Sequence, residues 1–211
     1  MNTSSPETVA CPTQRIEAFS DGVFAIAITL LILEIKVPHL HGDEAGQLGG
    51  ALLRLWPSYV AYLLSFVMIG IYWANHHYIF RFYRRTNHLF NLLNAFFLMC
   101  IAFLPFPTAV LAEYIADPQA GHTAIRFYAL GLLLPAVGWF AIWLYASTGY
   151  RLIDPRLSPS FVNSLTRQYL LSNLLYVIAV AASWWNGRVS LAICVGLTLL
   201  YLGPPKEPGY R

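Results

Sequence analysis

Residues 55–80 read LWPSYVAYLLSFVMIGIYWANHHYIF and contain no Asp, Glu, Lys or Arg. A helix rises about 1.5 Å per residue, so about 20 apolar residues cross the roughly 30 Å hydrocarbon core of a bilayer. This stretch is therefore long and apolar enough to form a transmembrane helix.

Further uncharged runs on the C-terminal side repeat this pattern at residues 89–112, 127–150, 168–187 and 189–205. The chain is 57% hydrophobic and 11% charged, whereas soluble domains carry about 25% charged residues. So few charges cannot cover the surface of a water-soluble fold of 211 residues. We expect an all-α, polytopic membrane protein in which these five runs form transmembrane helices two to six. Pro105 and Pro107 predict a kink in helix three.

The first apolar segment is shorter, because its uncharged part covers only residues 22–33, between Asp21 and Glu34. At about 1.5 Å per residue this part spans about 18 Å, so its charged ends lie at or inside the membrane boundary. Charged side chains at that depth face protein or water. We therefore expect helix one to be a central helix.

Helical periodicity divides residues 15–38, RIEAFSDGVFAIAITLLILEIKVP, into two faces. One face, at about 100° per residue, carries Phe19, Gly22, Ile26, Thr29, Leu30 and Leu33. Asp21 points to the opposite side. The apolar face either packs against other helices or, repeated around a symmetry axis, forms hydrophobic rings that gate by dewetting.

Asp21 needs a partner inside the membrane. The inner end of helix two, WANHH at residues 73–77, offers candidates. We expect a hydrogen-bond network of Arg15, Ser20, Asp21 and His77 that locks helix one to helix two.

Lys and Arg residues divide unequally between the loops, which predicts the orientation. With the N-terminus inside, the cytoplasmic segments hold Arg15, Arg81, Arg84, Arg85, Arg151, Arg156, Arg167, Lys206 and Arg211. The outer segments hold Lys36, Arg54, Arg126 and Arg188. Both termini should therefore be cytoplasmic. We expect a disordered N-terminus at 1–14, a six-helix unit at 15–203 and a disordered cytoplasmic tail at 204–211.

Two charged features allow alternative interpretations. Glu34 either forms an acidic ring at the mouth of a symmetric assembly or pairs with Lys36 or Arg54. The cluster at residues 81–85 is most simply a topology determinant, with anionic-lipid contact as a second possibility.

The sequence favours neither an enzyme nor a nucleic-acid-binding protein. His76 and His77 are adjacent and point about 100° apart on a helix, so they do not chelate one metal ion. There is no G-x-S-x-G motif, and a net charge of +3 is too small to indicate nucleic acid. Cys100 and Cys194 are interpreted as small apolar core residues. We expect no metal, cofactor or covalent chemistry.

A resemblance extends this interpretation. Arg15, Phe19, Ser20 and Asp21 make an R-x-x-x-F-S-D pattern, and its continuation through Leu31 resembles the first helix of the endolysosomal potassium channel family known as transmembrane protein 175. The inner end of helix two is similar to that family as well, at Trp73, Asn75, His76 and His77. The resemblance covers the whole chain in topology, with one six-helix unit as in the bacterial members.

The resemblance implies a homotetramer with helix one lining the pore. Ile26, five residues after the motif aspartate, corresponds to the family's main constriction. Thr29, Leu30 and Leu33 line the pore further out, and the arginine, serine and aspartate of the motif, here Arg15, Ser20 and Asp21, pack helix one against its neighbours.

The sequence contains no T-V-G-Y-G filter, so modest selectivity for potassium over sodium is expected. We therefore predict a potassium-permeable channel in the cell membrane. The alternatives are a secondary transporter of a cation or small solute, which would use broken helices and inverted repeats, and a structural or enzymatic membrane protein.

Overall fold

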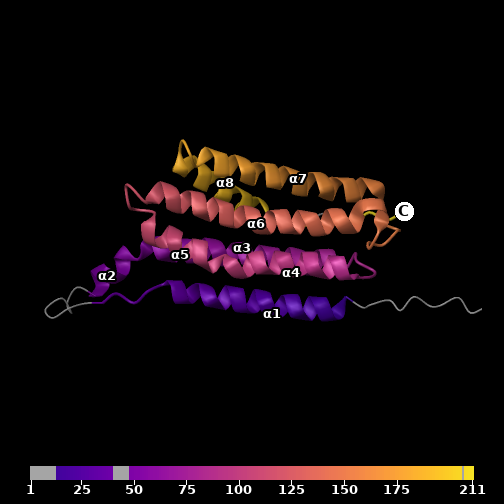
Figure 1. Cartoon of the computed structure of the whole chain (residues 1–211), viewed down its shortest axis with the longest axis horizontal. Helices are drawn as coiled ribbons and strands as arrows, with labels where there is room; N and C mark the ends of the chain where they lie inside the picture. The colour runs from indigo at the N-terminus through magenta and orange to yellow at the C-terminus, as the bar shows by residue number, and fades with distance from the viewer. Residues whose placement is uncertain (1–12, 40–47, 206) are drawn as a thin grey trace, which may run out of the picture.

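A computed structural model of the chain describes residues 13–39, 48–205 and 207–211, and its long elements are all helices (Figure 1). The α-helices are α1 (Gln14–Leu30), α2 (Leu48–Arg54), α3 (Trp56–Phe80), α4 (His88–Phe103), α5 (Pro105–Tyr114), α6 (Gly121–Ser147), α7 (Pro159–Ala182) and α8 (Gly187–Leu200). Two 3₁₀ helices continue α1 and α6, η1 (Leu31–Glu34) and η3 (Thr148–Tyr150). Of the predicted N-terminal segment 1–14, residues 1–12 lie outside the described part.

Five helical segments are long and apolar enough to cross a membrane. They are Gln14–Glu34, Trp56–Phe80, His88–Tyr114, Gly121–Tyr150 and Pro159–Ala182. The sixth predicted span corresponds to α8, a shorter apolar helix of 14 residues. The all-α, polytopic fold class predicted from the uncharged runs is confirmed.

The third span is broken where the prolines predict a kink. α4 ends at Phe103, and α5 begins at Pro105, which occupies the first helical position, where no backbone N–H is needed. α5 lies close to α6 beyond the break. A Cβ built on Gly131 of α6 would lie only 2.7 Å from Cγ of Pro107 on α5. Only glycine leaves room for this approach.

The core lies around α6, which packs against α4, α5, α7 and α8. Its largest fully buried side chains include Trp143 and Leu132 on α6 and Phe90, Phe97 and Ile101 on α4. Cys100 and Cys194 are also buried, as predicted. α1 contacts α3 and α4 and lies at one edge of the bundle, with α7 at the opposite edge (Figure 1).

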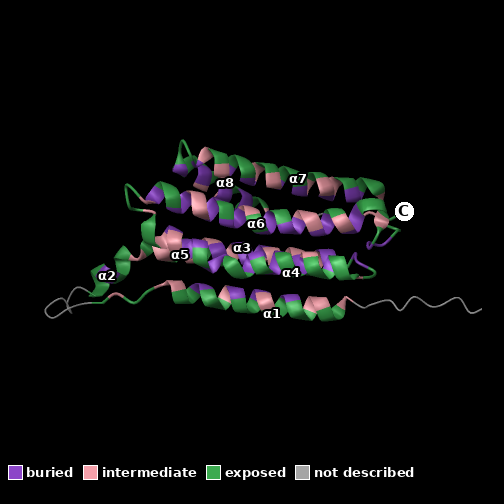
Figure 2. Ribbon diagram, in the orientation of Figure 1, coloured by how far each residue is buried: buried purple, intermediate pink, exposed green. Residues whose placement is uncertain are grey.

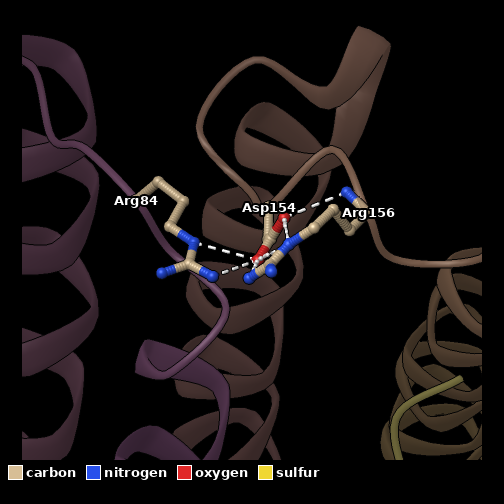
Figure 3. A network of polar contacts seen from close by, with 3 residues as sticks. All are labelled: Arg84, Asp154 and Arg156. Atoms are coloured by element: carbon tan, nitrogen blue, oxygen red, sulfur yellow. Dashed lines mark hydrogen bonds and ion pairs between the residues drawn. The ribbon is translucent and has the colours of Figure 1, made fainter. Parts of the chain in front are cut away.

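A buried carboxylate joins two loops at the end of the bundle where basic residues gather. Asp154 of the α6–α7 loop pairs with Arg84 of the α3–α4 loop and with Arg156 (Figure 3). Backbone bonds reinforce the contact, since Asp154 N donates to Phe82 O at 2.8 Å. The bonds from Arg156, and then from Arg84, hold the pKa of the Asp154 carboxyl well below its usual range.

The prediction of a disordered C-terminal tail is wrong for its last residues. Ser158 N donates to Gly209 O at 2.8 Å, and Arg211 N donates to Arg156 O at 2.8 Å. The Arg211 guanidinium also lies 5.4 Å from the centre of the Tyr150 ring. Composition alone suggested disorder, but the α6–α7 loop supplies backbone partners for the tail.

Candidate functional site

α1 packs against the bundle through one side only. Its buried residues are Ser20, Phe24 and Ala27, followed by Leu31 of η1. They repeat at the spacing of one helical face. The opposite side of α1 is exposed along the helix, as Figure 2 shows.

The exposed side includes the face that the periodicity selected, together with Asp21, Ala25 and Ile32 from the opposite face. Phe19, Ile26 and Leu33 are each 61% exposed, and Leu30 is 43% exposed. Gly22 and Thr29 of the same face are exposed too. The subunit therefore leaves a long apolar strip of α1 without a partner from its own chain among the described residues.

Thr29 is the hydroxyl on this strip. Its Oγ1 donates back to Ala25 O and Ile26 O, at 2.9 Å each. Because the proton is directed at the backbone, the oxygen lone pairs remain on the exposed side of the helix. Thr29 thus presents an acceptor to whatever the strip faces.

A buried chain of polar groups fixes the other side of α1. Ser20 Oγ donates to Ile16 O at 2.7 Å and accepts from Asn94 Nδ2 of α4 at 3.0 Å. Asn94 Oδ1 in turn lies 3.2 Å from His76 Nε2 of α3, so the imidazole donates this bond. Ser20, Asn94 and His76 are at most 1% exposed.

Aromatic rings enclose the imidazole at the end of this chain. The His76 ring stacks on Phe80 with centroids 4.0 Å apart, and Phe24 of α1 meets it edge-on at 5.5 Å. His76 therefore links α1, α3 and α4 through both hydrogen bonding and packing.

Asp21 makes a separate contact with α3. Trp73 Nε1 donates to Asp21 Oδ1 at 3.0 Å. The carboxylate thus bonds the side of α3 while the apolar strip remains clear. This bond and the Ser20–Asn94–His76 chain join α1 to both helices that it contacts.

The structure corrects the predicted Arg15, Ser20, Asp21 and His77 network. His77 Nε2 lies 3.1 Å from an Arg81 guanidinium nitrogen, and it is the adjacent His76 that belongs to the chain reaching Ser20. Within the described residues, the Arg15 side chain forms no hydrogen bond or ion pair with the other three. The adjacent histidines point in different directions, and the sequence alone did not indicate which one faces α1.

Two further residues of the predicted set have local roles. Asn75 Nδ2 donates to Ile71 O, one turn earlier on α3, at 2.9 Å. Glu34 is half-buried at the end of η1, and Lys36 Nζ donates to Leu33 O at 3.0 Å. Among the described residues, Glu34 forms no ion pair with Lys36 or Arg54, the pairing that the sequence left open.

Asn94 is the site residue that the sequence analysis missed. It lies within the uncharged run 89–112, where an amide has no water to bond and needs a protein partner. The two amides of this run, Asn91 and Asn94, were the available signal, because a buried polar group in a membrane helix predicts a partner on a neighbouring helix. The sequence did not indicate which of the two is buried.

Comparison with known proteins places this geometry in a family. The family described as "Endosomal/lysosomal potassium channel TMEM175" matches residues 15–105, which contain α1 and the helices that hold it. A potassium channel of Chamaesiphon minutus is 46% identical over 189 residues, covering 90% of this chain and 93% of that protein. The chain belongs to the TMEM175 family.

Other relatives extend the comparison. A potassium channel of Streptomyces collinus is 42% identical over 194 residues, covering 92% of this chain and 93% of that protein. The Gallus gallus protein named "Endosomal/lysosomal proton channel TMEM175" is 37% identical over 139 residues, which cover 63% of this chain and 28% of that protein. All three are named as channels, so the prediction that the chain is not an enzyme is confirmed.

Solved structures support the same fold. The crystal structure of a lysosomal potassium-selective channel TMEM175 homologue from Chamaesiphon minutus superposes with a TM-score of 0.80 at 44% identity, covering 90% of this chain and 96% of that one. A variant of the potassium channel MtTMEM175 superposes with a TM-score of 0.58 at 21% identity, covering 94% of each chain. This second likeness supports the fold alone.

Proposed function

We propose that the chain is one subunit of a homotetrameric, potassium-permeable cation channel whose pore is lined by the exposed face of α1. The observation that carries the proposal is the apolar strip of Phe19, Ile26, Leu30 and Leu33, which the subunit itself leaves uncovered. Potassium is proposed as the permeant ion because two relatives are named as potassium channels and the chain belongs to the TMEM175 family.

The charges at both ends of α1 favour a central position over a lipid-facing one. The uncharged part at 22–33 spans about 18 Å, well short of the roughly 30 Å hydrocarbon core. Against lipid, Asp21 or Glu34 would lie in hydrocarbon, where a carboxylate is costly. Around a hydrated axis, Glu34 faces water, and four copies form an acidic ring that concentrates cations at the mouth.

The constriction in this proposal is the ring of Ile26 side chains. An isoleucine offers no ligand that replaces the water around a cation, so a narrow ring stays dry and closed. A cation crosses only when the ring widens enough to hydrate. About one turn further along, the Thr29 oxygens then coordinate the ion or accept hydrogen bonds from its water.

The proposed channel crosses the cell membrane several times and has both termini on the cytoplasmic side. The distribution of Lys and Arg supports this orientation, because most of these residues belong to the loops on the side of the C-terminus. In this orientation Glu34 lies at the outer mouth.

The decisive experiment is the reversal potential of purified protein in a planar bilayer under opposed potassium and sodium gradients. Wild type is expected to carry a potassium-leaning current. Ile26→Ala is expected to carry a larger and less selective current, because a smaller side chain widens and wets the constriction. Glu34→Gln is expected to lower conductance most at low ionic strength, where surface charge is least screened.

Ile32→Ala provides the matched control, because Ile32 is 51% exposed but belongs to the other face of the helix. Its current should match wild type. An unaltered reversal potential and current in an assembled Ile26→Ala channel would refute the constriction. Saturating flux that requires a coupling gradient would favour the transporter alternative.

A further inference from the structure

Two pairs of arginines lie at the basic end of the bundle, and their surroundings differ. Arg84 and Arg156 share the buried carboxylate of Asp154 (Figure 3). Both ion pairs found among the described residues go to this aspartate. The single carboxylate of Asp154 thus compensates one of the two positive charges and holds both guanidinium groups in place.

Arg85 and Arg151 lie beside them without a carboxylate partner in the described part of the chain. Arg85 donates through Nε and Nη2 to the carbonyl oxygen of Arg151, at 3.1 and 3.0 Å. The Arg151 guanidinium lies 4.4 Å from the centre of the Tyr145 ring. The Arg85 side chain is thus held against the backbone of Arg151, and none of these contacts neutralises either exposed cation.

The support beneath this pair is itself ordered. Asn87 Nδ2 donates to the hydroxyl of Tyr145 at 2.9 Å, joining the start of α4 to the end of α6. Asn87 Oδ1 also caps α4 by accepting from Phe90 N at 2.9 Å. Like charges on neighbouring loops repel each other, and a bound anion would compensate this repulsion.

The position of the pair matches the headgroup level of a bilayer. Arg85 lies in the loop just before α4, which begins at His88, and Arg151 directly follows the span Gly121–Tyr150. Toward the membrane interior, both helices expose apolar side chains, among them Leu92 on α4 and Leu144 on α6. The two helices also lie side by side, since a Cβ on Gly138 would be 3.2 Å from Cα of Phe97.

We propose that Arg85 and Arg151 form a binding site for the phosphate headgroup of an anionic phospholipid, whose acyl chains lie along α4 and α6. Guanidinium groups are suited to phosphate oxygens, which they bind through paired N–H donors. Juxtamembrane arginines are also attracted to anionic lipid surfaces. The proposal concerns lipid binding and is independent of the conduction pathway.

Native mass spectrometry of the purified full-length protein in detergent tests the site, with phosphatidylglycerol and phosphatidylcholine as probes. Wild type should retain phosphatidylglycerol in preference to phosphatidylcholine. The double variant Arg85→Gln/Arg151→Gln should bind phosphatidylglycerol roughly 30-fold more weakly, the combined effect expected of two juxtamembrane arginines. Arg85→Lys/Arg151→Lys, which keeps the charge but loses the planar fork, should recover part of the affinity.

Arg54→Gln/Arg188→Gln removes the same charge from exposed residues at the opposite end and should leave the affinity unchanged. The proposal is overturned if the double glutamine variant binds phosphatidylglycerol like wild type, or if the control loses as much affinity. Displacement of the lipid by inorganic phosphate at low concentration would assign the site to free phosphate and would also overturn it. Should the glutamine variant fail to fold, the lysine pair decides: unchanged affinity there contradicts guanidinium recognition.

Discussion

At the scale of single residues, Asn94 carries a buried contact that three helices share. Its amide donates to Ser20 on α1 and accepts from His76 on α3, with little exposure to solvent. Removing one member of such a chain leaves the remaining groups buried without partners. The sequence instead suggested Asp21, which follows Ser20, and His77, which follows His76. Asp21 is a carboxylate in a membrane helix, and both residues belong to the segments that resemble the family.

Asn94→Ala should lower the free energy of unfolding by about 1–3 kcal/mol, because Ser20 and His76 each lose a bond and stay buried. Thermal denaturation of the reconstituted protein measures this effect. Asn91→Ala is the matched control, since Asn91 lies on the exposed side of the same helix and should change stability little. Equal melting temperatures for the two variants would contradict the structural role of the chain.

Asp154→Asn should weaken the joint between the two loops. The loss should be about 1–2 kcal/mol, below that of a fully buried ion pair, because the Arg84 and Arg156 side chains are 55% and 68% exposed. The folded-state pKa of Asp154 is lowered. Its contribution is therefore complete above the ordinary carboxyl pKa of about 3.9 and is lost as the pH falls below it.

Melting temperatures measured between neutral pH and about pH 3 test this sign. Wild type should lose more stability on acidification than Asp154→Asn, which has already lost the charge. Glu113→Gln, an exposed carboxylate variant on α5, should keep the wild-type acid response. Parallel curves for wild type and Asp154→Asn would contradict the assignment.

At the scale of elements, the face of α1 was predictable because a helix has one period. The spacing of Phe19, Ile26 and Leu33 defined a strip, and the structure leaves the same strip exposed. Partners on other helices were not predictable in the same way. Which histidine of α3 reaches α4 depends on the rotation of one helix against another, and local periodicity carries no information on that.

Gly131→Ala should disrupt the contact between α5 and α6. The added methyl would lie 2.7 Å from Cγ and 3.0 Å from Cβ of Pro107, whose ring has little freedom to move aside. We expect a loss of about 1–3 kcal/mol, as for overpacked cores, measured by thermal denaturation. Gly196→Ala, where an added methyl meets nothing within 4 Å, should be neutral or stabilising. A stable Gly131→Ala protein would show that α5 moves freely.

At the scale of the whole molecule, the apolar helices followed from where charges are absent, although only five of the six predicted spans are long enough to cross a membrane and α8 is shorter. Length and hydrophobicity decide whether a helix crosses a membrane, so the sequence was sufficient for the fold class. The tail was not predictable from composition, because its order depends on backbone partners near Arg156 and Ser158. What covers the exposed strip of α1 depends on neighbouring subunits, so neither the sequence nor the structure of one chain identifies it.

The most direct test of the central proposal is the block of potassium current by a cationic methanethiosulfonate reagent at Leu33→Cys. Both test variants also carry Cys11→Ser, so that this native thiol does not react, while the native Cys100 and Cys194 are buried. Ile32→Cys on the other face is the control. If α1 lines a hydrated pore, the reagent reduces the current of Leu33→Cys and leaves Ile32→Cys unchanged. Unchanged current in a conducting Leu33→Cys channel, with the thiol shown to be unmodified, would contradict a pore lined by this face.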